Sequence, residues 1–239
     1  MRVFITGDKH GDFSFLEDFC ATYHTTQNDV LIILGDAGIL YYGEKSRREK
    51  YTKDMISRYP ITLFCVRGNH EDRAEDRAEM TMKEMFDNTV YYDPCYPNIL
   101  HAIDGCRYEI NNESFFVIGG AYSVDKFYRL MMGWKWNPKE QLTNEEMLRI
   151  EEKIKERHFN HILAHTCPFS WEPTYLFLSG LDQSTVDNTM EHWLEDIVRH
   201  CSWDNYWFGH FHGDNMDICG DGKAHMLFND IKEIKFSER

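Results

Sequence analysis

The side chains that could do chemistry in this sequence are carboxylates, one amide and several imidazoles that follow short apolar runs. They are Asp8, His10, Asp36, Asn69, His165, His210 and His212. Oxygen donors mixed with imidazole nitrogens suit manganese, iron or zinc better than a calcium cage or a thiolate site. Two such ions about 3.5–4 Å apart can turn a bridging water into hydroxide near neutral pH. The donor set therefore predicts a dinuclear metal centre that could attack phosphorus.

The elements that must position these donors are five short strands. Residues 61–66 form an apolar run with β-branched and aromatic side chains, followed by Gly68, Asn69, His70 and Glu71. Similar runs precede the other donors, over residues 3–6, 30–34, 162–164 and 206–208. In an open α/β sheet, ligands collect beyond the carboxyl ends of the strands. We therefore expect the five strand ends to converge on one site.

The intervening segments predict helices and further strands. Helical patterns cover residues 13–23, 46–58, 72–85, 143–157 and 186–198. The second and fourth begin with the capping-box patterns Ser46-x-x-Glu49 and Thr143-x-x-Glu146. The third is densely charged and is predicted to be a solvated helix face. Short β-rich runs over residues 90–118 predict a second, mostly antiparallel sheet.

Length and composition favour one globular domain spanning residues 1–239. The chain is 42% hydrophobic and 28% charged, which is enough apolar material to bury a core of ordinary size. Its apolar runs are far shorter than the roughly 20 residues that span a bilayer. The first donor, Asp8, comes too early to leave room for a cleavable signal peptide. We therefore expect a cytoplasmic protein that does not associate with membranes.

The cysteines and the net charge restrict the possible partners. Seven cysteines, an odd number with no C-x-x-C pair, fit reduced thiols better than a disulfide framework. The formal net charge of −14 disfavours long nucleic acid and anionic membranes, because binding to these needs a basic surface. Bound divalent cations would still reverse the field locally. The composition thus favours a small phosphoester as partner and leaves the oligomeric state open.

The order of the blocks resembles the calcineurin-like metallophosphoesterase family. The signature of that family is Asp-x-His, Gly-Asp, Gly-Asn-His-Glu/Asp, a lone His and Gly-His-x-His, each after a strand. This chain has Asp8-Lys9-His10, Gly35-Asp36, Gly68-Asn69-His70-Glu71, His165 and Gly209-His210-Phe211-His212. Each block alone is a weak signal, and their fixed order makes the resemblance specific. The resemblance implies an α/β fold, a four-layer α/β/β/α sandwich of two mixed β-sheets flanked by helices.

Carried over residue by residue, the resemblance implies two divalent metal ions, with manganese expected first and iron or zinc as alternatives. One ion would be bound by Asp8, His10 and His212, the other by Asn69, His165 and His210, and Asp36 would bridge them. His70 would donate to the substrate phosphate or the leaving-group oxygen, oriented by the adjacent Glu71. Asn69 would also help to stabilise charge on the phosphoryl oxygens.

Three basic side chains are candidates for substrate binding. They are Arg67, Lys126 and Arg129. Arg67 precedes the Gly68 block, where the protein Ser/Thr phosphatase branch of the family has an arginine that contacts phosphate. That branch also has Gly-Asp-x-x-Asp-Arg-Gly at the second block, whereas Gly35-Asp36 is followed here by Ala-Gly-Ile-Leu-Tyr. The resemblance therefore places the chain outside that branch.

These features predict a phosphoesterase that hydrolyses a phosphomonoester or phosphodiester by in-line attack of a metal-bridging hydroxide. Two alternatives stay open. One is a catalytically silent scaffold of the same fold for protein interaction, which is disfavoured because every ligand position and His70 are filled. The other is a phosphatase or nuclease acting on nucleic-acid ends, although no recognisable nucleic-acid module accompanies the catalytic blocks.

Overall fold

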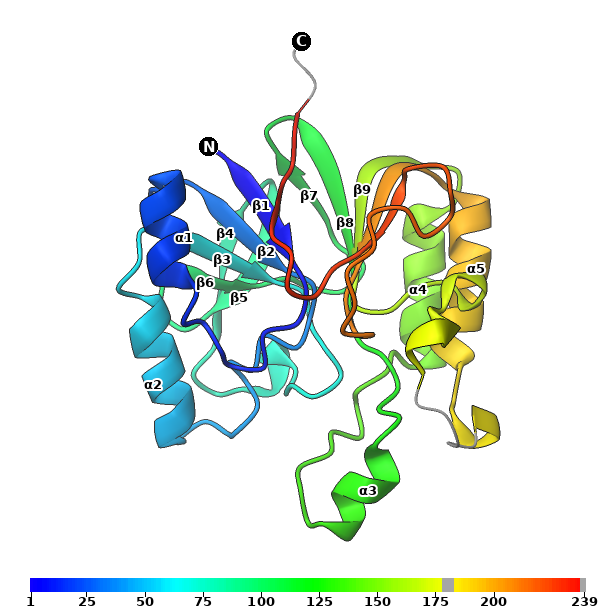
Figure 1. The fold of residues 1–239 in the computed structure, drawn as a ribbon, viewed down its shortest axis with the longest axis horizontal. Coiled ribbons are helices and arrows are strands. Elements are labelled where there is room, and N and C mark those ends of the chain that lie inside the picture. The colour runs from blue at the N-terminus through cyan, green and yellow to red at the C-terminus, as the bar shows by residue number, and fades with distance from the viewer. Residues whose placement is uncertain (178–182, 237–239) are drawn as a thin grey trace.

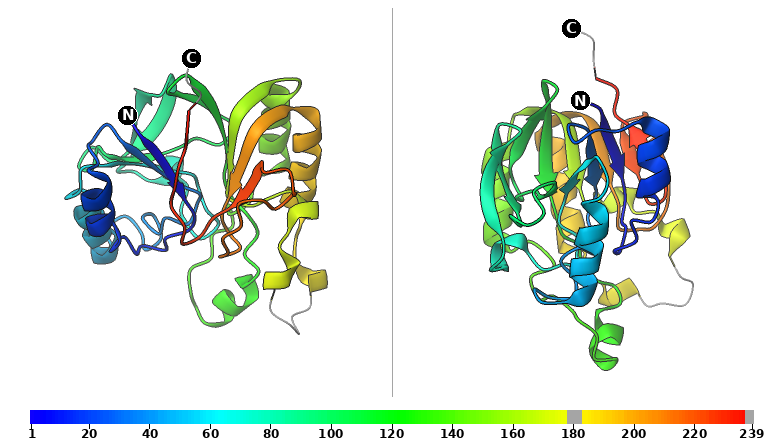
Figure 2. Two further views of the ribbon diagram at one scale, coloured as in Figure 1. Left: turned by 45° about the horizontal axis from the view of Figure 1, so that its top comes forward. Right: turned by 90° about the vertical axis from the view of Figure 1, so that its left-hand side faces the viewer.

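The computed structural model describes residues 1–177 and 183–236. Two β-sheets lie face to face, and helices cover the outer side of each (Figure 1). In Figure 2, the left view shows these layers from a further direction, and the right view looks onto the side covered by helices α1 and α2. In the described residues no helix is both long enough and apolar enough to cross a membrane. The layers confirm the predicted four-layer α/β/β/α arrangement.

The first sheet has seven strands in the order β12-β1-β2-β3-β6-β5-β4. The bounds are β1 Val3–Thr6, β2 Val30–Ile33, β3 Thr62–Cys65, β4 Thr81–Met85, β5 Asn88–Tyr92, β6 Ile99–His101 and β12 Lys232–Glu233. The strands β1, β2, β3 and β6 pair in parallel, and the other three are antiparallel to their neighbours. β1, β2 and β3 are buried along their whole length, as expected for parallel strands covered on both faces.

The second sheet has five strands in the order β11-β10-β9-β8-β7. The bounds are β7 Arg107–Ile110, β8 Glu113–Ile118, β9 His158–Ala164, β10 Ser202–Phe208 and β11 Ala224–Met226. The prediction that this sheet is mostly antiparallel was wrong, because only β7 and β8 pair that way. β5 and β6, which were predicted to belong to it, extend the first sheet instead. Local β-propensity finds strands but does not identify their partners.

Four of the five α-helices in the described residues cover the sheets, and the predicted helix positions are largely confirmed. The bounds are α1 Leu16–Tyr23, α2 Arg47–Ile56, α3 Lys126–Met131, α4 Asn144–Ile154 and α5 Thr189–His200. Helix α4 starts with the full capping box of Thr143 and Glu146. At α2, Ser46 caps the helix by accepting from the Arg48 amide, while Glu49 is buried and used elsewhere. Helix α3 lies on a segment that projects from the sandwich (Figure 1).

The predicted helix over residues 72–85 was wrong. A short 3₁₀ turn at Ala74–Asp76 and strand β4 occupy that stretch. Its charges do not form one solvated face, because Arg77 is buried and pairs with the buried Glu49 at 2.6 Å. Charged residues that pair with distant parts of the chain look the same in sequence as an exposed helix face.

The apolar core lies in three layers, one between the sheets and one under the helices on each side. The layer between the sheets takes Ile32 and Phe64 from the first sheet and Phe115 and Leu163 from the second. All four side chains are fully buried. This shared core holds the carboxyl ends of strands from both sheets in fixed positions relative to each other.

Candidate metal centre

The carboxyl ends of β1, β2, β3, β9 and β10 bring the predicted donors together. Asp8, after β1, accepts a hydrogen bond from the His210 amide, after β10, at 2.9 Å. Asn69 Oδ1, after β3, lies 2.8 Å from His165 Nε2, after β9. His165 Nδ1 lies 2.7 Å from the Leu34 carbonyl oxygen, at the end of β2. Side chains from both sheets therefore meet in one place, as the topology requires.

Two groups of donor atoms could each hold a metal ion. In the first group, Asp8, His10 and His212 each place one donor atom within 4.8 Å of the others. In the second group, Asp8, Asp36 and His165 do the same. Asp36 Oδ2 also lies 3.9 Å from His10 Nδ1, so Asp36 faces both groups. The Asp8 carboxylate belongs to both groups and Asp36 faces both, so the two groups are adjacent, as two neighbouring ions would need.

The contact between His165 and Asn69 brings two hydrogen-bond acceptors together. A carbonyl oxygen only accepts, so the bond to Leu34 fixes the ring proton of His165 on Nδ1 and leaves a lone pair on Nε2. Burial lowers the pKa of His165, which keeps the ring neutral. Asn69 Nδ2 donates to Ser123 Oγ at 2.8 Å, and this turns Asn69 Oδ1 toward His165. Two acceptors that face each other in this way fit a cation that binds both.

Asp8 provides a second indication of a cation site. Its Oδ2 is buried and has no hydrogen-bond partner of normal geometry among the described residues. His212 Nε2 lies 3.4 Å and His10 Nε2 3.9 Å from this oxygen. Burial acts to raise the pKa of Asp8, but the surrounding imidazoles and the His210 amide together outweigh burial and lower that pKa. In Asp36, burial and the Asp8 carboxylate both raise the pKa. Two buried carboxylates at such close range fit the bound charge of divalent ions.

Four of the predicted ligands have left-handed backbone conformations. The φ angle is 46° at His10, 43° at Asp36, 66° at His210 and 53° at His212. Non-glycine residues pay of the order of 1–3 kcal/mol for such strained positions, which persist where the surrounding structure fixes them and cluster at functional sites. The ring centroid of His210 lies 5.0 Å from that of His165, beside the second donor group.

The glycines that precede Asn69 and His210 make room for carboxylates that follow other strands. A Cβ at Gly68 would lie 1.9 Å from Asp36 Oδ1, and one at Gly209 would lie 2.3 Å from Asp8 Oδ1. Real Cβ atoms do not approach oxygens so closely, so no other residue fits without moving the carboxylate. These glycines are therefore part of the way the donors are assembled.

Beside the donors is a small pocket of about 170 Å³ that contains His70 and Arg129. Arg129 Nη2 lies 3.2 Å from His70 Nε2, and Nη1 lies 3.2 Å from the Tyr41 hydroxyl. Arg129 Nε donates to Asp125 Oδ2 at 2.7 Å. Because the guanidinium only donates, His70 Nε2 accepts. Burial and then Arg129 lower the pKa of His70 to about 2, so the imidazole is neutral here.

Glu71 also lines this pocket. Among the described residues, its carboxylate makes no hydrogen bond or ion pair with the His70 imidazole. Its carboxylate is buried and accepts from the Ile39 amide at 3.1 Å. Burial and the neighbouring Asp36 raise the pKa of Glu71 to about 7. The geometry therefore ties Glu71 to the loop after Asp36, in contrast to the predicted contact that would orient His70.

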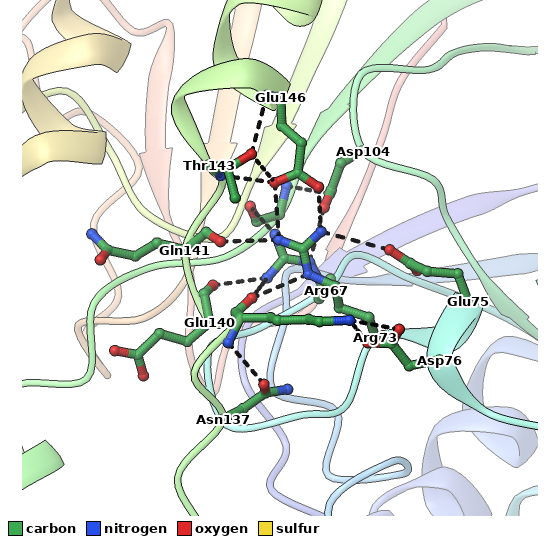
Figure 3. Close-up of polar contacts among 12 residues, drawn as sticks. Arg67, Arg73, Glu75, Asp76, Asp104, Asn137, Glu140, Gln141, Thr143 and Glu146 are labelled. Carbon is green, nitrogen blue, oxygen red and sulfur yellow. Dashed lines mark hydrogen bonds and ion pairs between the residues drawn. The ribbon is translucent and has the colours of Figure 1, made fainter.

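The predicted basic side chain Arg67 lies away from this pocket. Its guanidinium donates to Asp104 Oδ2 at 2.8 Å, to the Glu140 carbonyl at 2.8 Å and to the Gly119 carbonyl at 2.9 Å (Figure 3). These contacts join the residues just after β3 to the loops after β6 and β8 and to the segment between α3 and α4. The structure thus gives Arg67 protein partners where a substrate role had been predicted.

Lys126 and Arg129 lie in the same segment but face different surroundings. Lys126 Nζ lies 4.2 Å from the centre of the Trp136 ring, a cation–π contact. Arg129 lines the pocket with His70 and Asp36. Among the three predicted basic side chains, Arg129 is therefore the one that the structure brings to the donors.

Two residues that the sequence analysis missed orient Asn69. Ser123 Oγ accepts from Asn69 Nδ2 and donates to the buried carboxylate of Glu140, which also accepts from the Trp136 indole at 2.8 Å. This chain fixes which end of the Asn69 amide faces His165. Neither Ser123 nor Glu140 follows a strand with a recognisable spacing, so the sequence offers no signal for them.

Comparison with protein families gives one match. A sequence profile described as calcineurin-like phosphoesterase matches residues 1–214, a range that includes all seven predicted donors. A search of curated proteins finds no match.

Several solved structures can be aligned with most of this chain. One is the protein TT1561 of Thermus thermophilus, with a TM-score of 0.49 and 14% identity, covering 94% of this chain and 88% of that chain. A second solved structure has a TM-score of 0.50 and 15% identity, covering 99% of each chain. The phosphopantetheinyl hydrolase PptH from Mycobacterium tuberculosis has a TM-score of 0.41 and 12% identity, covering 95% of this chain and 89% of that chain. At such identities, the likeness to the second structure shows a shared fold alone.

Proposed function

Because the chain belongs to the calcineurin-like phosphoesterase family, we propose that it hydrolyses a phosphomonoester or a phosphodiester with two divalent metal ions. The observation that carries the proposal is the pair of facing acceptors, His165 Nε2 and Asn69 Oδ1, beside the unpartnered Asp8 Oδ2. When bound, the ions supply an activated water and polarise the phosphoryl oxygens. Manganese is the first expectation, with iron or zinc as alternatives, because the donors mix carboxylate, amide and imidazole.

We assign the ligands by donor group. The first ion takes Asp8, His10 and His212, whose donor atoms lie together. The second takes His165 of the second group, Asn69, which faces it, and His210, whose ring lies beside it, and Asp36 is shared because it faces both groups. The support is that acceptor atoms surround each proposed ion position. Hydrogen bonds within the protein do not satisfy all of these acceptors.

His70 and Arg129 hold the substrate phosphoryl group in this proposal. The Arg129 guanidinium can give two parallel hydrogen bonds to phosphate oxygens. A bound phosphoryl group would neutralise Arg129 and so favour the protonated form of His70. His70 could then pass its Nε2 proton to the leaving-group oxygen as the bond to phosphorus breaks.

Glu71 acts as a positioning residue in this proposal. Its carboxylate holds the backbone of the loop after Asp36 through Ile39. The same loop carries Tyr41, whose hydroxyl accepts from Arg129. Glu71 therefore helps to position Arg129, which faces the substrate in this proposal. Residues that hold such groups in place are expected to affect activity.

Metal analysis of the purified protein, combined with assays on p-nitrophenyl phosphate and its bis-ester, tests the function. We expect nitrophenol release that depends on Mn²⁺ and disappears on chelation. A panel of cyclic, linear and nucleic-acid-end esters would then identify the substrate class. Fully loaded protein that hydrolyses none of these esters would contradict the proposal and support the non-catalytic scaffold.

Replacing Ser123 with alanine should weaken metal binding by roughly tenfold, because Asn69 would lose the partner that fixes its amide. Titration of metal-free protein with Mn²⁺ measures this. Ser114→Ala is a matched control, since Ser114 is also buried but bonds to Asn160. Equal metal affinity in the two variants would show that Ser123 does not orient Asn69.

We also propose that residues 1–239 form one domain, since the core layer between the sheets takes side chains from both. A single cooperative transition in calorimetric unfolding would support this, and two separate transitions would contradict it. The cytoplasmic location expected from the sequence stays a prediction.

A further inference from the structure

A second, larger cavity opens directly beside the metal centre. Its volume is about 810 Å³, within the usual range for small-molecule sites, and it is bordered at one end by Asp36, Asn69 and His210. Its walls come from the loop after β8, from described residues on the way from β9 to α5, from α5 itself and from the turn after β10. Phosphorus bound at the metal centre would therefore have one of its substituents in this cavity, which we call the leaving-group pocket.

The walls of the leaving-group pocket are aromatic and acidic. Tyr122, Phe169, Phe177 and Phe211 contribute rings. The rings of Phe177 and Phe211 are stacked, with centroids 6.1 Å apart. Such ring faces attract cations, most strongly where water is excluded.

No lysine or arginine is among the described residues that line this pocket. The sequence explains why, since it contains no Lys or Arg between Arg157 and Arg199. Lys126 lies 5.8 Å from the Tyr122 ring but does not itself line the pocket. A leaving group with a second phosphate or a carboxylate would therefore meet no counter-charge there.

Glu191 is the strongest single indication of what the pocket binds. Its side chain lines the pocket, and the residue is only 4% exposed. Oε1 accepts from Thr166 Oγ1 at 2.9 Å, but Oε2 is buried without a hydrogen-bond partner among the described residues. Glu172 also lines the pocket and has no ion-pair partner among the described residues. Burial, and to a lesser degree Glu172, raises the pKa of Glu191 to about 7. A bound cation would relieve both carboxylates.

We propose that the leaving-group pocket binds an organic leaving group that carries an amine or a quaternary ammonium. The inference rests on the proposed phosphoesterase function and specifies its substrate class. Aromatic rings combined with unpaired carboxylates form the environment that recognises ammonium groups. In the reaction, water adds to phosphorus and the bond to the leaving-group oxygen breaks. The alcohol departs with a proton, and its ammonium group is unchanged.

Binding of choline, measured by calorimetry, tests the pocket independently of catalysis. We expect the wild-type protein to bind choline at least about tenfold more tightly than its neutral isostere 3,3-dimethylbutanol. Glu191→Gln keeps the bond to Thr166 and should reduce this preference by about tenfold. Asp196→Asn, on the same helix but with an exposed side chain, should leave the preference unchanged. Equal binding of the two alcohols, or an unchanged preference in Glu191→Gln, would overturn the inference.

Kinetics with matched esters separate this inference from the proposed function. The ratio of kcat/KM for phosphocholine to that for 3,3-dimethylbutyl phosphate should exceed one in the wild type and fall in Glu191→Gln. If p-nitrophenyl phosphate is hydrolysed but the ratio is one, only the assignment of the leaving group is wrong. If no ester is hydrolysed although metal is bound, the phosphoesterase proposal itself fails.

Discussion

The Asp36→Asn variant is expected to lose bound metal and phosphoesterase activity together, with activity lower by about two to three orders of magnitude. Asp36 is buried and faces both donor groups, so its loss affects both proposed ions. An asparagine at this position keeps an oxygen that can accept from the His70 amide, as Asp36 Oδ1 does at 3.0 Å. The local backbone should therefore survive the change. Metal content by elemental analysis and Mn²⁺-dependent hydrolysis are the two measurements.

Thermal unfolding distinguishes a lost site from a lost fold. Without metal, Asp36→Asn should unfold at the same or a higher temperature than the wild type, because burial and the nearby Asp8 carboxylate disfavour ionised Asp36. Asp12→Asn is the matched control, since the Asp12 carboxylate bonds only locally to Ser14. An Asp36→Asn protein with full metal content and normal activity would contradict the bridging role.

The His70→Ala variant is expected to keep its metal and to lower kcat by about 10²-fold to 10⁴-fold, the usual contribution of a general acid. His70 lies in the pocket with Arg129, and its imidazole is proposed to face the substrate without binding metal. The expected pattern is therefore the reverse of that for Asp36: metal content is unchanged and turnover is lost. Steady-state kinetics on metal-loaded protein measure this, and retained turnover would rule out the role.

Three further variants test whether the loss of turnover is specific to the pocket that contains His70 and Arg129. Arg129→Gln should raise KM more than it lowers kcat, because Arg129 is proposed to bind the phosphoryl group and not to move a proton. Arg67→Gln should act mainly on stability, since Arg67 bonds to Asp104 and to two carbonyls. His200→Ala, an exposed histidine that bonds to its own helix, should change neither parameter.

The strands that carry the donors could be predicted because their signal is local. A short apolar run followed by glycine and a polar donor needs no knowledge of distant parts of the chain. Pairing partners are not local, and for this reason β5 and β6 were assigned to the wrong sheet. The helix predicted over residues 72–85 failed for a related reason. The partner of Arg77 is Glu49, which lies in a different segment of the chain.

At the site, the residues that could be predicted are those in the strand-end blocks. Their supports could not be predicted, because the contacts of Ser123 with Asn69 and of Glu71 with Ile39 join segments that only the fold brings together. Arg67 shows the same limit. It precedes a donor block in sequence, yet the strand points its guanidinium toward Asp104. Position directly after a strand therefore predicts candidate donors, but it does not predict which residues surround them.

The origin of the pocket walls has an evolutionary consequence. The donors follow buried strands fixed by the core, whereas Arg129 on α3 and much of the leaving-group pocket come from the residues after β8 and from described residues on the way from β9 to α5. Insertions and substitutions are tolerated in such connections much more readily than in core strands. Substrate choice could therefore diverge by changes in these connections while the proposed metal ligands stay the same.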